Sequence, residues 1–267
     1  MLNKLLKYDL KYIYKTQIYI YGMTLICLII AKTFQTSVHG SFIYLSINLS
    51  FMIFTYGLIF ILMINNFARL WSRFKNTIYG DESYLIHTLP LSKSQIFLSK
   101  GISSIITIST STLFVFIVDL VVRNFKPRGV YVYSDSTYNV FSDVLNQYLN
   151  NFKTQTLMWF LILLVLITLS IIGYFALILG QRAKNNKLVR SIIIAALLFL
   201  LTLALCFGFY TIIAIFNSGI SNFLWSSTLT NSTEKTLMII TIVFYTMASS
   251  VYYLLGLREL KKGIDVE

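Results

Sequence analysis

Few residues in this chain could carry out catalysis, because its 267 residues include only two histidines, His39 and His87. Neither histidine falls inside a long apolar segment, where an intramembrane hydrolase would need its general base. The sequence also contains no HExxH metal-binding motif and no GxxxxGK[ST] phosphate-binding loop. We therefore expect no catalytic residue, no metal site and no cofactor bound by this chain.

One acidic residue, Asp119, lies clearly inside an apolar segment, and Arg123 follows it four residues later. A charge inside a membrane is costly, so it is a functional hypothesis by default. The spacing places both side chains on one face of a helix, where they can pair. We expect a structural ion pair here, and the alternative is a proton or cation relay.

The elements that must position these residues are six apolar stretches. A bilayer core of about 30 Å requires about 20 helical residues, and that length recurs at 17–36, 42–64, 98–122, 156–179, 191–216 and 237–256. Hydrophobic residues make up 57% of the chain and charged residues 12%, whereas soluble domains carry about 25% charged residues. Because backbone polar groups in a bilayer must be satisfied internally, we predict an all-α integral membrane protein with six transmembrane helices in one domain, 1–267.

The net charge of +12 is distributed according to topology and does not form one basic patch with interleaved aromatics, so nucleic acid is not an expected partner. Lysines and arginines concentrate in alternate connecting segments, including both ends of the chain. The positive-inside rule therefore predicts cytoplasmic termini. Glycines inside the spans, at Gly57, Gly173 and Gly208, are expected to allow helices to approach closely.

Residues 1–16 alternate with helical period between leucines and lysines, with Lys4, Lys7 and Lys11 on the polar face. This pattern predicts an amphipathic helix lying in the membrane interface, separate from the first span. Asp9 interrupts the apolar face. We expect it to pair with a lysine or with another cytoplasmic loop, and the alternative is an ion pair at a moving junction.

The longest cytoplasmic segment lies between the second and third spans. Gly80 should end the preceding helix, and Pro90 should end the short helix that follows. The acids Asp81 and Glu82 favour a helix start. A helix at 80–90 is predicted, and its candidate contact residues are Asp81, Glu82, Tyr84, Leu85, His87 and Leu89. Ser92 and Gln95 form a capping box that opens the next helix.

On the outer side, apolar residues at helical spacing predict an amphipathic helix at 138–152 within the loop 123–154. We expect it to rest on the bundle or on the membrane surface, and substrate contact is the alternative. The outer half of the second span is comparatively polar because it contains Ser46, Asn48, Ser50 and Thr55. These residues predict either hydrogen bonds between helices or the wall of a transport pathway.

The order of these elements resembles the permease subunit of bacterial ABC-2-type exporters, which have the ABCG-like, type V architecture. The local likeness lies in residues 84–100, YLIHTLPLSKSQIFLSK. The resemblance implies that 80–90 is the coupling helix, which docks on a separate ABC ATPase subunit, and that the N-terminal helix is the connecting helix at the same interface. It also implies that ATP and Mg are bound by that partner, and that two permease copies work with two ATPases in a bacterial plasma membrane.

Within that family, spans two and five face the pathway, and a re-entrant segment precedes span six, matching 218–236 here. The cargo class implied is an amphipathic peptide, such as a phenol-soluble modulin, or another amphiphile. The outer segment after span three is longer than in the simplest family members. A different class of function is also open, namely a non-transporting immunity or sensor component that recruits a cytoplasmic partner.

Overall fold

The computed structural model describes residues 2–36, 42–80, 82–88, 92–123, 152–182, 186–217, 219–221 and 231–262. Across these ranges the named elements are all helices: α1 (Leu2–Thr36), α2 (Phe42–Tyr79), α3 (Ser83–Thr88), α4 (Lys93–Arg123), α6 (Phe152–Gln181), α7 (Lys187–Phe216) and α9 (Asn231–Lys261). Six of them, all except α3, are long and apolar enough to cross a membrane. The prediction of an all-α, multi-pass membrane protein is confirmed at this level.

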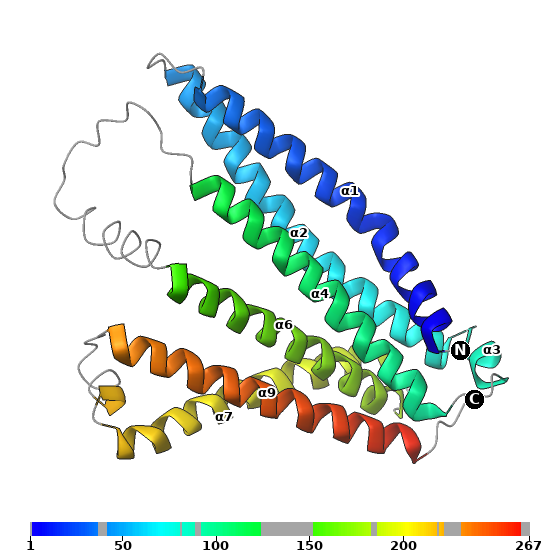
Figure 1. Cartoon of the computed structure of the whole chain (residues 1–267). Helices are drawn as coiled ribbons and strands as arrows, with labels where there is room; N and C mark the ends of the chain where they lie inside the picture. The colour runs from blue at the N-terminus through cyan, green and yellow to red at the C-terminus, as the bar shows by residue number, and fades with distance from the viewer. Residues whose placement is uncertain are drawn as a thin grey trace.

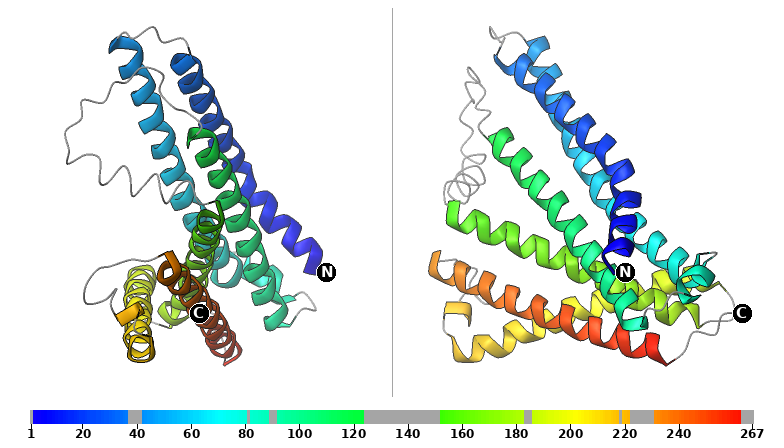
Figure 2. Two further views of the ribbon diagram at one scale, coloured as in Figure 1. Left: turned by 60° about the vertical axis from the view of Figure 1, so that its left-hand side comes forward. Right: turned by 45° about the vertical axis from the view of Figure 1, so that its right-hand side comes forward.

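The six long helices form two groups of three, shown in Figure 1: α1, α2 and α4 lie in one group, and α6, α7 and α9 in the other. The groups meet at the end of the molecule that carries the start of α1, α3 and the end of α9, which we call the terminal end. They diverge toward the opposite end, as both views in Figure 2 also show. Successive long helices run in opposite directions, as expected for a chain that crosses a membrane six times.

Helix α6 is the centre of the molecule, since it packs on α7 and α9 and also contacts α2 and α4. In its most apolar stretch 61% of the residues are buried, compared with 11% in the corresponding stretches of α2 and α7. Helices α2 and α7 therefore direct most of their apolar surface outward, where lipid or another protein chain must cover it.

The prediction of a separate interfacial helix at 1–16 is wrong, because α1 is one continuous helix from Leu2 to Thr36. A single buried stripe runs along it and includes Asp9, Ile13, Gln17, Thr24 and Ala31. The intervals of four to seven residues keep this stripe on one face, which packs on α2 and α4. The apolar side of residues 1–16 is thus used for contact with the protein's own helices; the helix contains no proline and continues through its glycine, Gly22.

Helix α2 extends past the predicted span to Tyr79 and ends at Gly80. A Cβ atom on Gly80 would lie 2.9 Å from the Cα of Asn76, closer than Cβ atoms normally approach, so the turn requires glycine. The predicted capping box at the start of α4 is confirmed. The Ser92 N–H donates to Gln95 Oε1 at 3.1 Å, and the Gln95 N–H donates to Ser92 Oγ at 3.3 Å.

Close helix approach is confirmed at Gly173, where any Cβ would collide with the indole ring of Trp71. It also occurs at Gly180, where a Cβ would lie 2.8 Å from the Cα of Ser191 on α7. At Gly57 and Gly208 the helices of the described chain do not approach closely, because a Cβ on either would meet none of its atoms within 4 Å. Both of these glycines belong to the outward-facing helices α2 and α7.

A cluster of aromatic rings joins the two groups of helices near the terminal end, and we call it the aromatic cluster. Phe74 of α2 stacks on Tyr174 of α6 with 4.5 Å between ring centroids, and meets Phe97 of α4 edge-on at 6.1 Å. Phe97 in turn packs against Tyr253 of α9 at 5.0 Å. Four helices are therefore fixed to one another at this level.

Several predictions fall outside the residues that the structure describes. They include the amphipathic outer helix at 138–152 except for its last residue, and most of the predicted re-entrant segment at 218–236. Both stay predictions.

Candidate functional site

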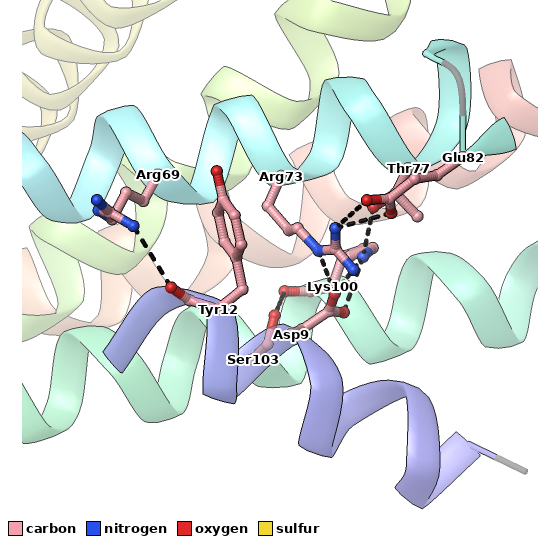
Figure 3. Close-up of polar contacts among 8 residues, drawn as sticks. All are labelled: Asp9, Tyr12, Arg69, Arg73, Thr77, Glu82, Lys100 and Ser103. Atoms are coloured by element: carbon pink, nitrogen blue, oxygen red, sulfur yellow. Dashed lines mark hydrogen bonds and ion pairs between the residues drawn. The ribbon is translucent and has the colours of Figure 1, made fainter. Parts of the chain in front are cut away.

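A group of four charged side chains, two of them buried, connects three helices and the start of a fourth at the terminal end (Figure 3). Lys100 of α4 donates to both carboxylate oxygens of Asp9 on α1, at 2.7 and 2.8 Å. Arg73 of α2 donates from Nε to Asp9 Oδ1 at 3.0 Å and from its terminal nitrogen to both oxygens of Glu82, at 2.6 and 2.7 Å. We call Asp9, Arg73, Glu82 and Lys100 the ion cluster.

The ion cluster is electrically balanced, with two carboxylates and two cations. Lys100 completes its hydrogen bonding by donating to Thr77 Oγ1 at 3.0 Å, so all three ammonium donors are used. Buried charges are tolerated only when they are paired and hydrogen-bonded in this way. The contacts therefore account for the presence of two charges in a nearly dry position.

Exposure of the side chains increases from one end of the ion cluster to the other. Asp9 is 1% exposed and Lys100 is 2% exposed, whereas Arg73 is 17% exposed and Glu82, which directly precedes α3, is 44% exposed. Arg73 lies between the buried pair and the accessible carboxylate and contacts both. Arg73 therefore connects the residue before α3 with the buried pair.

Tyr12 of α1 supports this arrangement from the side. Its ring lies beneath the guanidinium groups of Arg69 and Arg73, at 5.6 and 5.2 Å from the ring centroid, within the range of cation–π contacts. Arg69 also donates to the Tyr12 carbonyl oxygen at 3.4 Å. These contacts hold the first turns of α1 against α2.

Further polar contacts continue along α1 toward the opposite end. The Tyr14 hydroxyl bonds that of Thr110 at 2.7 Å, and the Tyr21 hydroxyl bonds that of Ser111 at 2.8 Å. Between them, buried Gln17 donates to the side-chain oxygen of Asn66 on α2. Helices α1, α2 and α4 are thus joined by polar side chains as well as by apolar packing.

The face of α4 that meets α1 is rich in small hydroxyl side chains. Most are buried and bond the carbonyl three or four residues earlier: Ser103, Ser104, Thr107, Ser111 and Thr112. Because these five hydroxyls are satisfied within their own helix, the face stays compact. The buried Ser99 hydroxyl of the same helix has no hydrogen-bond partner in the described part of the structure.

The predicted coupling residues are placed in part. Glu82 belongs to the ion cluster and Tyr84 of α3 is 76% exposed, facing away from the bundle. Leu85 and His87 lie in α3, whose boundaries fall within the predicted 80–90, but their side chains are outside the described part of the structure, as are Asp81 and Leu89 entirely.

The predicted connecting-helix residues divide by face. Lys4, Lys7 and Lys11 are exposed, whereas Asp9 is fully buried. The expectation that Asp9 pairs with a lysine is confirmed, and the partner is Lys100 from another helix.

Of the four polar residues in the outer half of α2, two are turned toward the protein's interior. Asn48 donates to the Ala31 carbonyl of α1 at 2.9 Å, and Thr55 is buried and bonds the Phe51 carbonyl at 2.8 Å. The contact of Asn48 agrees with the interpretation as hydrogen bonding between helices. Ser50 is exposed and bonds the carbonyl of Ser46 at 2.8 Å. A pathway lined by Ser46 and Ser50 stays a prediction.

Asp119 and Arg123 both lie at the end of α4. The Arg123 side chain is outside the described part of the structure, so the ion pair between them stays a prediction.

The sequence patterns do not identify Arg73, Lys100 or Thr77 as members of this site; Arg73 and Lys100 belong only to the basic connecting segments. A signal was present, since Asp9 is a lone charge on an otherwise apolar face and Lys100 is the one charge between Lys93 and Asp119 in the third apolar segment. Two such charges of opposite sign on helices at the same membrane side are candidates for a buried pair.

Within the described ranges, no three His, Cys, Asp or Glu side chains gather in a way that could hold a metal ion. Both carboxylates of the ion cluster already face cations. The chemistry of the site is therefore electrostatic linkage between helices.

No family model, curated protein or solved structure matched this chain when it was compared with them.

Proposed function

We propose that this chain is the membrane-spanning permease subunit of an ATP-driven exporter of the ABC-2 type, working with a separate ATPase that binds ATP and Mg. The observation that carries the proposal is the ion cluster. It connects Glu82, the residue before the short helix α3, to the ends of α1, α2 and α4 that lie at the terminal end. A permease driven by a partner needs such a link between its docking surface and its transmembrane helices.

Force applied to α3 has a short route into the bundle. Gly80 ends α2 two residues before Glu82, and in this proposal α3 tilts about that turn. Glu82 then displaces Arg73, which contacts Asp9 on α1, and Asp9 is bound to Lys100 on α4. Three helices would thus respond together.

The displacement would reach the second group of helices, α6, α7 and α9, through residues that neighbour the ion cluster on α2 and α4. Phe74 follows Arg73 on α2 and Phe97 precedes Lys100 by less than one helical turn on α4. Both rings belong to the aromatic cluster that contacts α6 and α9. A closely packed cluster of this kind transmits displacement because interiors are as dense as organic crystals.

The proposed assembly contains two copies of this chain and two ATPases in a bacterial plasma membrane, with the terminal end in the cytoplasm. The outward-facing apolar surfaces of α2 and α7 are the surfaces that a second copy would cover around a pathway. Tyr84, exposed on α3, would contact the ATPase, with Lys4, Lys7 and Lys11 nearby on α1. We assign the cargo to amphipathic peptides or similar amphiphiles, by the resemblance described above.

The test is nucleotide hydrolysis by the complete complex in nanodiscs. The chain and its ATPase are co-purified, and hydrolysis is measured with and without an amphipathic helical peptide. A permease predicts that the peptide stimulates hydrolysis several-fold. A complex that forms but shows no response to peptides, lipids or other amphiphiles would favour the immunity or sensor class and contradict the proposal.

A further inference from the structure

A groove lies on the outside of the bundle at the terminal end, between α2 and α7 with α6 as its floor. Its volume is about 290 Å³. Gly173 of α6 has no side chain, so the indole ring of Trp71 packs directly against α6 there, and both residues line the groove. Helices α2 and α7 form the two walls.

The α2 wall of the groove has a polar end near the end of that helix at Tyr79, where Ser72, Lys75 and Asn76 line it. Ala68 continues this wall one turn deeper, about 6 Å from Ser72 at 1.5 Å per residue. The rest of the lining, on α6 and α7, is mainly apolar and includes Leu177, Leu188, Ile192 and Ala195, with Ser191 as its polar member.

The charge at the polar end is positive. Lys75 lines the groove, no acidic residue does so, and no described carboxylate forms an ion pair with Lys75. A cation above an apolar trough is complementary to an anionic headgroup above an acyl chain.

The dimensions favour a lipid over a peptide. An α-helix with side chains is about 10–12 Å wide, and ligand pockets typically range from about 300 to 1,000 Å³. A groove at the lower limit of that range accommodates one headgroup and part of one acyl chain. A folded amphipathic peptide would need more space.

We propose that this groove binds a phospholipid with an anionic headgroup from the leaflet at the terminal end. The phosphate would lie beside Lys75, with Ser72 and Asn76 as hydrogen-bond donors, and an acyl chain would run between Ala68 and Ala195 over the edge of Trp71. This site does not depend on the transport proposal, since it requires only that the chain is embedded in a membrane.

Trp71 supplies a local reporter for the test. The chain has three tryptophans, so the variant Trp159→Phe/Trp225→Phe leaves Trp71 alone. The purified variant is placed in nanodiscs that contain increasing fractions of brominated phosphatidylglycerol or brominated phosphatidylcholine, and quenching of Trp71 fluorescence is recorded. We expect half-maximal quenching at an about fivefold lower fraction of phosphatidylglycerol, as the contribution of one lysine near a membrane surface predicts.

Three further substitutions in this background identify the groove. Lys75→Gln should remove the preference for phosphatidylglycerol, whereas Lys187→Gln, at the same end but outside the groove lining, should retain it. Ala195→Phe should fill the apolar part and reduce quenching by both lipids. Equal quenching curves for the two headgroups in the parent variant overturn the proposal. So does a phosphatidylglycerol preference that survives both Lys75→Gln and Ala195→Phe.

Discussion

Lys100 and Asp9 are separated by 91 positions in the sequence, yet the ammonium group of Lys100 lies 2.7 and 2.8 Å from the two carboxylate oxygens of Asp9. This pair fixes the start of α1 against α4 in a position where both side chains are almost fully buried. The first helix is therefore not a peripheral element, because its first turns are held by charge inside the bundle.

The first prediction concerns the stability of this pair. Asp9→Leu alone should destabilise the protein by about 3–5 kcal/mol, because it leaves Lys100 as an uncompensated buried charge. Lys100→Met alone should cost less, because Asp9 keeps its ion pair with Arg73. The double variant Asp9→Leu/Lys100→Met removes both charges and should recover most of that loss. Thermal unfolding in detergent measures all three. Additive losses in the double variant would show that the two charges do not stabilise one another.

The second prediction separates stability from coupling at Glu82. This carboxylate is partly exposed, so Glu82→Gln should change the free energy of unfolding by less than about 1 kcal/mol. The same substitution should lower peptide-stimulated hydrolysis by the partner ATPase several-fold, since it breaks the contact between α3 and Arg73.

A matched control for Glu82 is Glu259→Gln. Glu259 pairs with Arg182 at 2.6 Å at the same end of the molecule, but it joins α6 to α9 and has no contact with α3 among those described. It should leave stimulated hydrolysis close to that of the wild type. Equal effects of the two substitutions would argue against a specific role for the ion cluster.

The third prediction concerns the exposed ring of Tyr84 on α3. Tyr84→Glu should weaken association with the ATPase at least tenfold, because a charged side chain replaces an aromatic contact in the centre of a proposed interface. Tyr84→Phe keeps the ring and should associate normally. Binding is measured by titrating the ATPase into permease-containing nanodiscs. Unchanged affinity of the Tyr84→Glu protein would remove α3 from the docking surface.

The fourth prediction compares two glycines. Gly180→Ala should destabilise the protein by about 1–3 kcal/mol, because the new Cβ would lie 2.8 Å from the Ser191 backbone. Gly208→Ala should be neutral or stabilise the isolated chain by up to about 1 kcal/mol, since its Cβ meets nothing in the described chain and alanine favours the helix. Unfolding temperatures of both variants test this difference. A larger loss at Gly208 would indicate that α7 is covered by another chain in the purified protein.

The architecture was predictable because its signal is local. Six apolar segments of sufficient length, the end of α2 at Gly80 and the reciprocal bonds of Ser92 and Gln95 all follow from residues that are neighbours in the sequence. In each case the backbone or an adjacent side chain determines the outcome.

What could not be predicted depends on which helices meet. Leucines on one face of residues 1–16 fit a membrane surface and a protein surface equally well, and only the positions of Arg73 and Lys100 decide between them. Likewise, Gly173 and Gly57 both lie inside apolar spans, and the sequence does not distinguish them, but only Gly173 has an aromatic ring packed over it. Partner choice between distant helices is set by tertiary packing, which no local pattern records.

The most direct test of the central claim is ATP-dependent movement of a fluorescent amphipathic peptide across proteoliposomes that contain this chain, with and without its ATPase. We predict transport only when the ATPase and ATP are both present, and a several-fold slower rate when Glu82→Gln replaces the wild-type chain. Transport at the full rate without any ATPase, or with the ATPase but no nucleotide, would contradict the account.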